Sequence, residues 1–197
     1  MDRGIKIARL TGKNTYIKPW NSVREEIHKD VLSQGWNNDL KSFTQSYGDT
    51  HIDAANLRMG MNGFIDPLDE MYINTVRMTK KILCRDGLMY RYTNRDDFGF
   101  PESSFTICTF WMIKSLFLIG EKGEARKMFH RLLSYANHLG LFSEDIDFKT
   151  NALLGNFPQG YSHLALIDTA ITLFGSELTV QEELFQMLKE EKNGTGN

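Results

Sequence analysis

Three carboxylates lie close together in a segment that is rich in aromatic residues. Glu144, Asp145 and Asp147 occur within four positions, and the aromatic residues around them are Phe142, Phe148, Phe157 and Tyr161. A carboxylate beside aromatic rings can act as a general base on a water molecule next to a stacked sugar ring. The same residues also fit a solvated acidic loop without catalytic function. The residue types alone leave both interpretations open.

Patterns typical of metal or nucleotide chemistry are missing from the sequence. His130 and His138 are eight positions apart, which is too wide for the HExxH type of zinc pair. An EF-hand loop counted from Asp145 has Thr150 where glycine is required and Asn156 where glutamate is required. Neither GxGxxG nor a GxxxxGKS or GxxxxGKT motif occurs. The sequence therefore predicts no metal site and no cofactor.

The composition narrows the class of protein. The 197 residues carry 23 Lys and Arg against 25 Asp and Glu, a formal charge of -2, so the chain lacks the basic field that binds nucleic acid. Cys84 and Cys108 cannot form a disulfide framework. Charged residues are spread through positions 1–10, where a signal peptide is apolar, and the apolar run 105–119 contains Lys114 and is too short to span a bilayer. We expect one cytoplasmic domain that binds neither nucleic acid nor a membrane.

Apolar residues recur at helical spacing along most of the chain, whereas alternating strand patterns are scarce. Helices are predicted over residues 2–10, 20–33, 53–61, 67–83, 104–119, 121–136, 159–174 and 180–189. In the second of these helices, Val23, Ile27, Val31 and Leu32 share one face. Residues 137–158 are predicted to form one long loop, and loops of this length are usually functional. We expect an all-α fold built from an array of helical hairpins.

Two sequence blocks follow each other in the C-terminal part of the chain. LFSEDID occupies residues 141–147, and GNFPQGYSHLALI occupies residues 155–167. They resemble the C-terminal signature of glycoside hydrolase family 15, the glucoamylase family, in which a loop of the form LLSEE(Y/I)D precedes a GNFPQ(A/G)(F/Y)SHLALI helix. Further similar segments are GWN at 35–37, FTQSYG at 43–48, HIDAA at 51–55, DGLMYRY at 86–92 and FTICTFW at 105–111. The resemblance extends over approximately residues 1–175.

The resemblance implies a fold that this chain contains only in part. Members of the family form a six-hairpin (α/α)6 toroid, and we expect residues 1–189 to be the C-terminal half of that catalytic domain, followed by a flexible tail at 190–197. The family's general acid lies on an earlier loop of the form WE-x-R. No WE pair occurs here, because Trp20, Trp36 and Trp111 are followed by Asn, Asn and Met. The chain is therefore expected to begin inside a helix and to hold the general base without the general acid.

The implied activity is hydrolysis of α-glucosides such as maltooligosaccharides or trehalose. The family's catalytic base is the carboxylate directly after the serine of the loop, which is Glu144 here, and Asp145 replaces the commoner glutamate. The implied mechanism is inverting, with the base and a separate acid about 6.5–9.5 Å apart on either side of the scissile bond. We expect no turnover by the chain alone, because the leaving oxygen would receive no proton.

Four substrate-binding candidates follow from the resemblance: Arg91, Glu102, Tyr161 and His163. Arg91 is expected to contact sugar hydroxyls, but it also fits a surface arginine paired with Asp96 or Asp97. Glu102 matches a family glutamate and also fits the start of a helix. Tyr161 can stack on a sugar face, although aromatic residues at helical spacing also fill cores. His163 fits a core histidine, the commoner role of such a residue, and the resemblance places it near the site.

Half of a closed ring of helices exposes apolar seams along two edges. We therefore expect the chain to pair with a separate N-terminal polypeptide, to self-associate or to be poorly soluble. Two alternatives to an enzyme remain. One is a non-catalytic helical-hairpin module for binding or scaffolding, in which substitutions of Glu144 leave the function unchanged. The other is a truncated gene product whose reading frame continues upstream.

Overall fold

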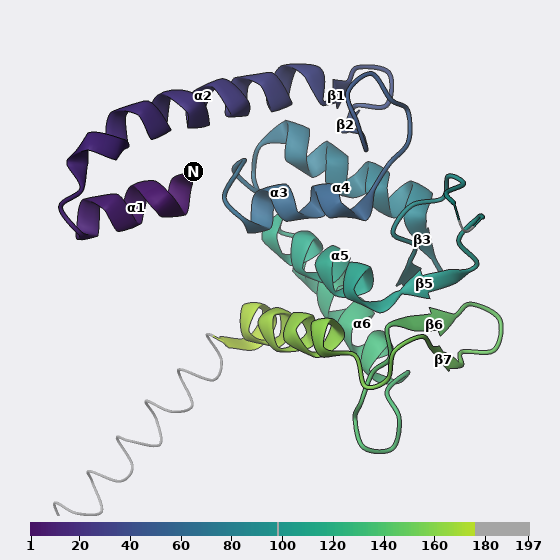
Figure 1. Ribbon diagram of the computed structural model, residues 1–197. Helices are drawn as coiled ribbons and strands as arrows, with labels where there is room; N and C mark the ends of the chain where they lie inside the picture. Colours follow the sequence, from purple (N-terminus) through teal and green to yellow (C-terminus); the bar gives the residue numbers. More distant parts are fainter. Residues whose placement is uncertain (98, 176–197) are drawn as a thin grey trace, which may run out of the picture.

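The chain folds as a mostly helical protein with small antiparallel sheets (Figure 1). The computed structural model describes residues 1–97 and 99–175, so the helix predicted at 180–189 and the tail predicted at 190–197 lie outside the described residues. The labelled helices are α1 (Asp2–Leu10), η1 (Asn14–Tyr16), α2 (Ile17–Gln34), η2 (Ala54–Leu57), α3 (Arg58–Met61), α4 (Glu70–Leu83), α5 (Thr106–Leu118) and α6 (Lys122–Leu133). A further helix covers residues 160–175.

Short strands connect these helices. They are β1 (Trp36–Asn37), β2 (Ser42–Phe43), β3 (Cys84–Arg85), β4 (Leu88–Met89), β5 (Ser103–Phe105), β6 (Asp145–Asp147) and β7 (Leu153–Leu154). They form the antiparallel pairs β1–β2 and β3–β4 and a sheet of order β5-β6-β7. Within the part of the chain that the structure describes, no helix has both the length and the apolar character needed to cross a membrane.

The core lies around α5, whose residues are buried on several sides. α5 and α6 form a hairpin around Gly120, whose φ of +91° favours glycine. Buried side chains from η2, α4, α5, α6 and the helix of residues 160–175 form one cluster, which includes Leu57, Tyr72, Val76, Phe110, Ile113, Leu116, Phe129 and Leu173. Because each large apolar side chain contributes about 1.5–3 kcal/mol when buried, this cluster fixes the helices from which the loops project.

The helix predicted at 67–83 begins later, at Glu70, because its cap lies at Asp69. The Asp69 side chain accepts a 2.8 Å hydrogen bond from the Met71 N–H. The Asp66 side chain accepts another from the Leu68 N–H, so these preceding residues form a turn. The sequence predicted the helix but placed its start inside this turn.

A tight hairpin after α4 returns the chain toward η2. Asp86 and Gly87 connect β3 to β4 with φ values of +51° and +78°, as in a type I′ turn. Tyr90 N–H then donates to the Leu83 carbonyl at 2.9 Å, and Ala54 N–H donates to the Arg91 carbonyl at 2.8 Å. The backbone of Arg91 is therefore fixed by its pairing with the start of η2.

α1 and α2 form a hairpin that projects from the rest of the molecule (Figure 1). α1 buries two apolar residues, but α2 buries none. Of the apolar face predicted for residues 20–33, Val23 is 38% exposed and Ile27 is 49% exposed, whereas Leu32 packs against the core cluster. His28 joins the hairpin to the segment before α4, with its Nε2 atom 2.9 Å from the Phe64 carbonyl oxygen.

The segment 137–158 is more regular than the predicted long loop. β6 and β7 lie within it, and β6 pairs with β5 so that Ser104 faces Ile146. Only three residues of β6 alternate in burial, which is too short a pattern to indicate a strand from the sequence. The acidic cluster thus begins a central strand of a small sheet.

Candidate active site

Glu144 lies immediately before β6, and its backbone is held on both sides. Its N–H donates to the Asn156 carbonyl at 3.0 Å, and its carbonyl accepts from the Thr106 N–H at 2.9 Å. The half-buried side chain is held through one oxygen, because Oε2 accepts from the backbone N–H of Asn156 at 3.2 Å and from its Nδ2 at 2.8 Å. Among residues 1–97 and 99–175, none forms a hydrogen bond with Oε1. The carboxylate is therefore oriented, with one oxygen open.

The start of the helix of residues 160–175 supports the two residues before Glu144. Gln159 N–H donates to the Phe142 carbonyl, and Ser162 Oγ donates to the Ser143 carbonyl, both at 3.0 Å. His163 Nε2 accepts from the Phe142 N–H at 3.3 Å, so Nδ1 carries the proton and donates to the Gln159 carbonyl at 2.7 Å. Both ring nitrogens of His163 are engaged with the backbone. His163 therefore supports the loop in this structure, and a contact with sugar stays a prediction.

Asp145 lines a pocket of about 280 Å³ together with Arg91. Ser103 Oγ donates a 2.7 Å hydrogen bond to Asp145 Oδ2. Burial raises the pKa of the Asp145 carboxyl, the Ser103 hydrogen bond opposes that rise, and the negative charge of Glu144 adds to it. The pocket thus brings a cation and a partly desolvated carboxylate to one polar hollow.

Arg91 is anchored by a buried carboxylate, rather than by the nearby aspartates that the sequence suggested as partners. Its Nε lies 3.7 Å from Asp53 Oδ2, and its side chain remains 52% exposed. Its guanidinium carbon lies 5.7 Å from the centroid of the Tyr92 ring. Arg91 is therefore held from behind, with much of its hydrogen-bonding surface available to a ligand.

Tyr161 lies in a second pocket, of about 330 Å³. Its side chain is 69% exposed, and the pocket also contains Trp111, whose ring centroid lies 5.2 Å from the Arg58 guanidinium carbon. Glu102 is exposed and lines neither pocket. The structure thus places Arg91 and Tyr161 in different hollows and leaves Glu102 outside both.

The junction between β5 and α5 contributes one residue to each pocket. Phe105 lines the first pocket and Ile107 lines the second, and the residue between them, Thr106, is the one whose N–H bonds to the Glu144 carbonyl. Glu144 does not itself line either pocket. Its backbone is instead fixed to the segment that separates them.

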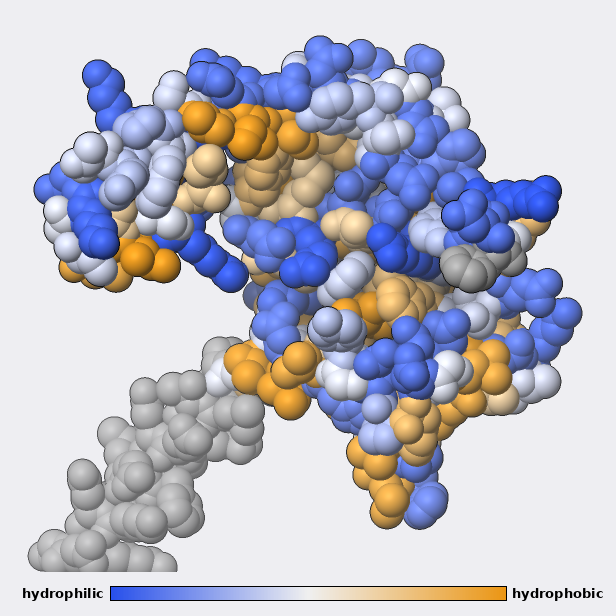
Figure 2. Space-filling model, in the orientation of Figure 1, coloured by the Kyte–Doolittle hydropathy of each residue, from blue (hydrophilic) through white to orange (hydrophobic). Residues whose placement is uncertain are grey.

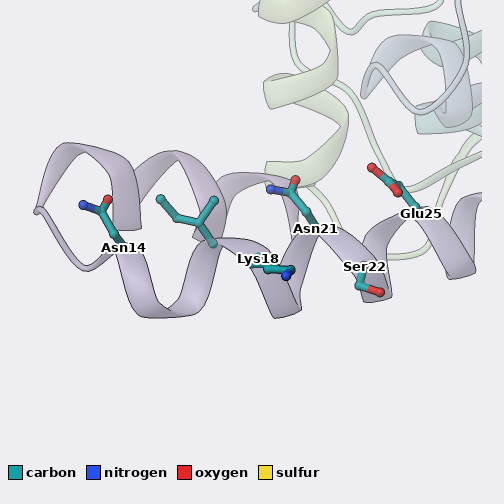
Figure 3. A pocket seen from close by; sticks show the side chains of 6 residues that line it. Asn14, Lys18, Asn21, Ser22 and Glu25 are labelled. Atoms are coloured by element: carbon teal, nitrogen blue, oxygen red, sulfur yellow. The ribbon is translucent and has the colours of Figure 1, made fainter.

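Two further hollows of the described residues contain none of the predicted site residues. One of about 590 Å³ lies along η1 and α2, and Figure 3 shows its side chains spread along the helix instead of converging on one point. Another, of about 650 Å³, lies between the α1–α2 hairpin and the segment at 62–64. For the described residues, no group of three His, Cys, Asp or Glu side chains is arranged to hold a metal ion.

Two residues position the candidates, and the sequence assigned a role to neither of them. Asn156 holds the Glu144 carboxylate, and Asp53 holds Arg91. Asn156 belongs to the GNFPQ block and Asp53 to the HIDAA block, so both lie in segments that carried the resemblance. Their residue types alone gave no signal, because the partners are 12 and 38 positions away in the sequence and meet only in the fold.

The sequence matches a family profile and several trehalases. The sequence profile of glycosyl hydrolases family 15 matches residues 1–171. A trehalase of Thermoplasma volcanium is 43% identical over 170 residues, which are 86% of this chain and 27% of that protein. A trehalase of Mycobacterium tuberculosis is 38% identical over 180 residues, which are 90% of this chain and 26% of that protein. The chain thus spans about a quarter of the length of these relatives.

Solved structures resemble the fold at lower identity. A wild-type glycosidase superposes with a TM-score of 0.68 at 18% identity, over 80% of this chain and 45% of that one. A glycosidase variant in complex with glucose superposes with a TM-score of 0.69 at 16% identity, over the same shares of each chain. The described fold therefore corresponds to rather less than half of those structures.

Proposed function

The chain belongs to glycosyl hydrolases family 15, and we propose that it supplies the general-base side of a trehalase-like α-glucosidase. The trehalases that it resembles favour trehalose as the substrate. The observation that carries the proposal is the carboxylate of Glu144, whose Oε2 is held by two N–H donors of Asn156 while Oε1 is open. A general base needs this combination of a fixed orientation and a free oxygen.

In the proposed reaction, Glu144 Oε1 takes a proton from a water molecule as that water attacks the anomeric carbon. The glucosidic bond breaks, and its oxygen takes a proton from a carboxylic acid on the opposite side of the sugar. The configuration inverts, because the water enters opposite to the leaving group. The sequence contains no WE pair, so we expect the acid to come from polypeptide outside these residues and the chain alone to be inactive.

The proposal includes a fold in which the chain forms part of a larger (α/α)6 toroid. Apolar side chains remain exposed along one face of the helix of residues 160–175, and those of Leu164, Ile167 and Ile171 are 65%, 56% and 61% exposed. Figure 2 shows apolar patches over this helix, below α1 and on the underside of α2. Exposed apolar surface of this extent favours association. We expect the remaining helices of the ring, or a second copy of the chain, to cover it.

A chimeric trehalase tests the proposed base directly. Residues 1–171, which match the family profile, replace the corresponding segment of the Thermoplasma volcanium trehalase, and the release of glucose from trehalose is measured. We expect the chimera to hydrolyse trehalose and Glu144→Gln to lower kcat about 10²–10⁴-fold, the range of general-base contributions. Asp147→Asn is the matched control, because this nearby carboxylate bonds to its own turn at Thr150.

Two results would contradict the proposal. Full activity of the Glu144→Gln chimera would exclude Glu144 as the base and favour a binding or scaffold module. Hydrolysis of trehalose by the purified chain alone would show that the acid lies within these residues.

A further inference from the structure

Asp53 is a buried carboxylate with two separate sets of contacts. It stands at the start of η2, and its side chain is only 8% exposed. Oδ1 accepts a 2.7 Å hydrogen bond from the Ala55 N–H and thereby caps the helix. Oδ2 lies 3.5 Å from Gln45 Nε2 and 3.7 Å from Arg91 Nε. One oxygen therefore serves the local fold, and the other faces the pocket arginine.

The cap alone does not account for this residue. A neutral asparagine or serine caps a helix about as well as aspartate, so capping does not require a buried charge. A buried carboxylate is costly unless a cation or hydrogen-bond donors compensate it. Arg91 is the cation that the structure places beside it, and Ala54 N–H also holds the Arg91 carbonyl at 2.8 Å. Both the backbone and the guanidinium of Arg91 are thus tied to the start of η2.

The charges of Asp53, Arg91 and Asp145 all affect the pKa of the Cys108 thiol on α5. Burial is the main cause that raises the pKa of the Cys108 thiol; the charges of Asp53 and Asp145 raise it further, and that of Arg91 lowers it. Asp53 supports Arg91, and Arg91 and Asp145 line one pocket.

We propose that Asp53 is a positioning residue that holds the Arg91 guanidinium ready to bind hydroxyl groups of a glucose ring in the pocket shared with Asp145. The inference rests on the proposed function, because only a sugar substrate gives Arg91 this task. Asp53 touches no substrate and acts only through Arg91. Ordering a long side chain before it binds a ligand changes affinity by about two- to tenfold.

Asp53→Asn separates the two contacts, because asparagine keeps the cap and loses the charge. In the full chain, NMR measures the solvent exchange of the Arg91 side-chain Nε–H, and calorimetry measures the affinity for trehalose. We expect slow exchange in the wild type, faster exchange in Asp53→Asn and about two- to tenfold weaker binding of trehalose. Asp53→Ser, which also caps, is expected to behave in the same way.

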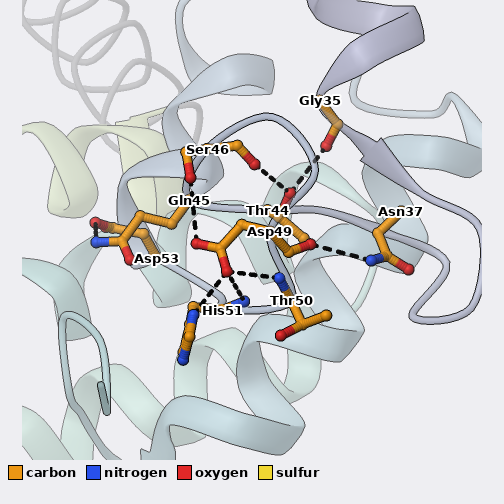
Figure 4. Close-up of polar contacts among 9 residues, drawn as sticks. All are labelled: Gly35, Asn37, Thr44, Gln45, Ser46, Asp49, Thr50, His51 and Asp53. Atoms are coloured by element: carbon orange, nitrogen blue, oxygen red, sulfur yellow. Dashed lines mark hydrogen bonds and ion pairs between the residues drawn. The ribbon is translucent and has the colours of Figure 1, made fainter. Parts of the chain in front are cut away.

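Asp49→Asn is the matched control. Figure 4 shows that Asp49 lies in the same loop region and makes its own contacts with Ser46, Thr50 and His51, whereas Asp53 faces Gln45. This variant is expected to leave both the Arg91 exchange rate and the affinity for trehalose unchanged. A change in Arg91 exchange as large as that of Asp53→Asn would show a general loosening of the loop and overturn the inference.

The outcomes for Asp53 and for the proposed function can be told apart. Fast exchange of the Arg91 Nε–H in the wild type, or unchanged exchange in Asp53→Asn, overturns the positioning role whatever the affinity. Arg91→Gln that binds trehalose as tightly as the wild type overturns the sugar contact instead. If the wild-type chain binds trehalose too weakly to measure, that result also counts against the contact between Arg91 and the sugar. In that case the Arg91 exchange rates alone test whether Asp53 positions Arg91.

Discussion

Gly155→Ala tests whether the orientation of Glu144 depends on the close approach of its neighbour. Gly155 has a φ of +73°, and a Cβ atom there would lie 3.0 Å from both the Cβ and the Oε2 of Glu144. Alanine in this left-handed conformation costs about 1–2 kcal/mol by itself. The added methyl group must also push the carboxylate away from Asn156, and a hydrogen bond to a charged group contributes about 1.5–3 kcal/mol.

Gly140→Ala supplies a matched control in the same connecting segment. Gly140 has a φ of +76°, but a Cβ atom there would meet nothing within 4 Å. Both variants therefore carry the cost of the left-handed backbone, and only Gly155→Ala carries the contact with Glu144. We expect Gly155→Ala to lose about 1.5–3 kcal/mol more unfolding free energy than Gly140→Ala in urea denaturation.

Activity separates the two variants more sharply than stability does. In the chimeric trehalase, Gly155→Ala is expected to lower kcat by less than about 10²-fold, because a misplacement of about 1 Å has an effect of that size and the 3.0 Å contact requires a smaller shift of the Glu144 carboxylate. Gly140→Ala is expected to keep the kcat of the parent chimera. Equal losses of stability in the two variants, or an unchanged kcat in Gly155→Ala, would refute the idea that Asn156 and Gly155 set the orientation of Glu144.

Three further predictions concern protonation and the exposed surface. Because the pKa of Asp145 is raised in the folded state, its protonated side chain stabilises the fold below about pH 3.8, and this stabilisation is lost as the pH rises through the raised pKa. The unfolding free energy of Asp145→Asn, measured by urea titration, should therefore rise relative to that of the wild type as the pH increases through this pKa. Burial raises the pKa of Tyr72 from 10.0 to about 12, so the wild type should lose about 3 kcal/mol between pH 10 and 12, and Tyr72→Phe should lack this alkaline loss. Ile167→Glu should reduce self-association of the isolated chain in size-exclusion chromatography, with a change of unfolding free energy within about 0.5 kcal/mol.

The helices were largely predictable because their signals are local. The predicted helix at 2–10 matches α1, and that at 53–61 matches η2 and α3 behind the Asp53 cap. The run at 104–119 is apolar over several turns and becomes the buried helix α5. In these segments periodicity, capping residues and glycine ends act over a few neighbouring positions.

The elements that hold the candidate site were not predictable in the same way. β6 and β7 are three and two residues long, and the pairing of β6 with β5 joins positions about 40 apart in the sequence. The apolar face of α2 shows another limit, since periodicity predicted that four apolar residues share one face and the structure leaves one of them, Ile27, 49% exposed. Periodicity indicates that a face is suited to burial, but it does not say which polypeptide covers it.

The acidic cluster shows what the structure adds to a list of candidate carboxylates. Asp147 Oδ1 accepts hydrogen bonds from the N–H groups of Lys149 and Thr150 and from the Thr150 hydroxyl, all within one turn. The bonds from Thr150 are the main cause that lowers the pKa of Asp147. Asp145 is bonded to Ser103 in the pocket of Arg91, and burial favours its neutral form. Glu144 is fixed through Oε2 by two N–H donors of Asn156, and among the described residues none bonds to its Oε1; Asp147 is likewise held through one oxygen only. A base must be oriented and must still accept a proton from water, and the geometry of Glu144 meets both requirements. The resemblance, in which the base directly follows the serine of the loop, distinguishes Glu144 from Asp147.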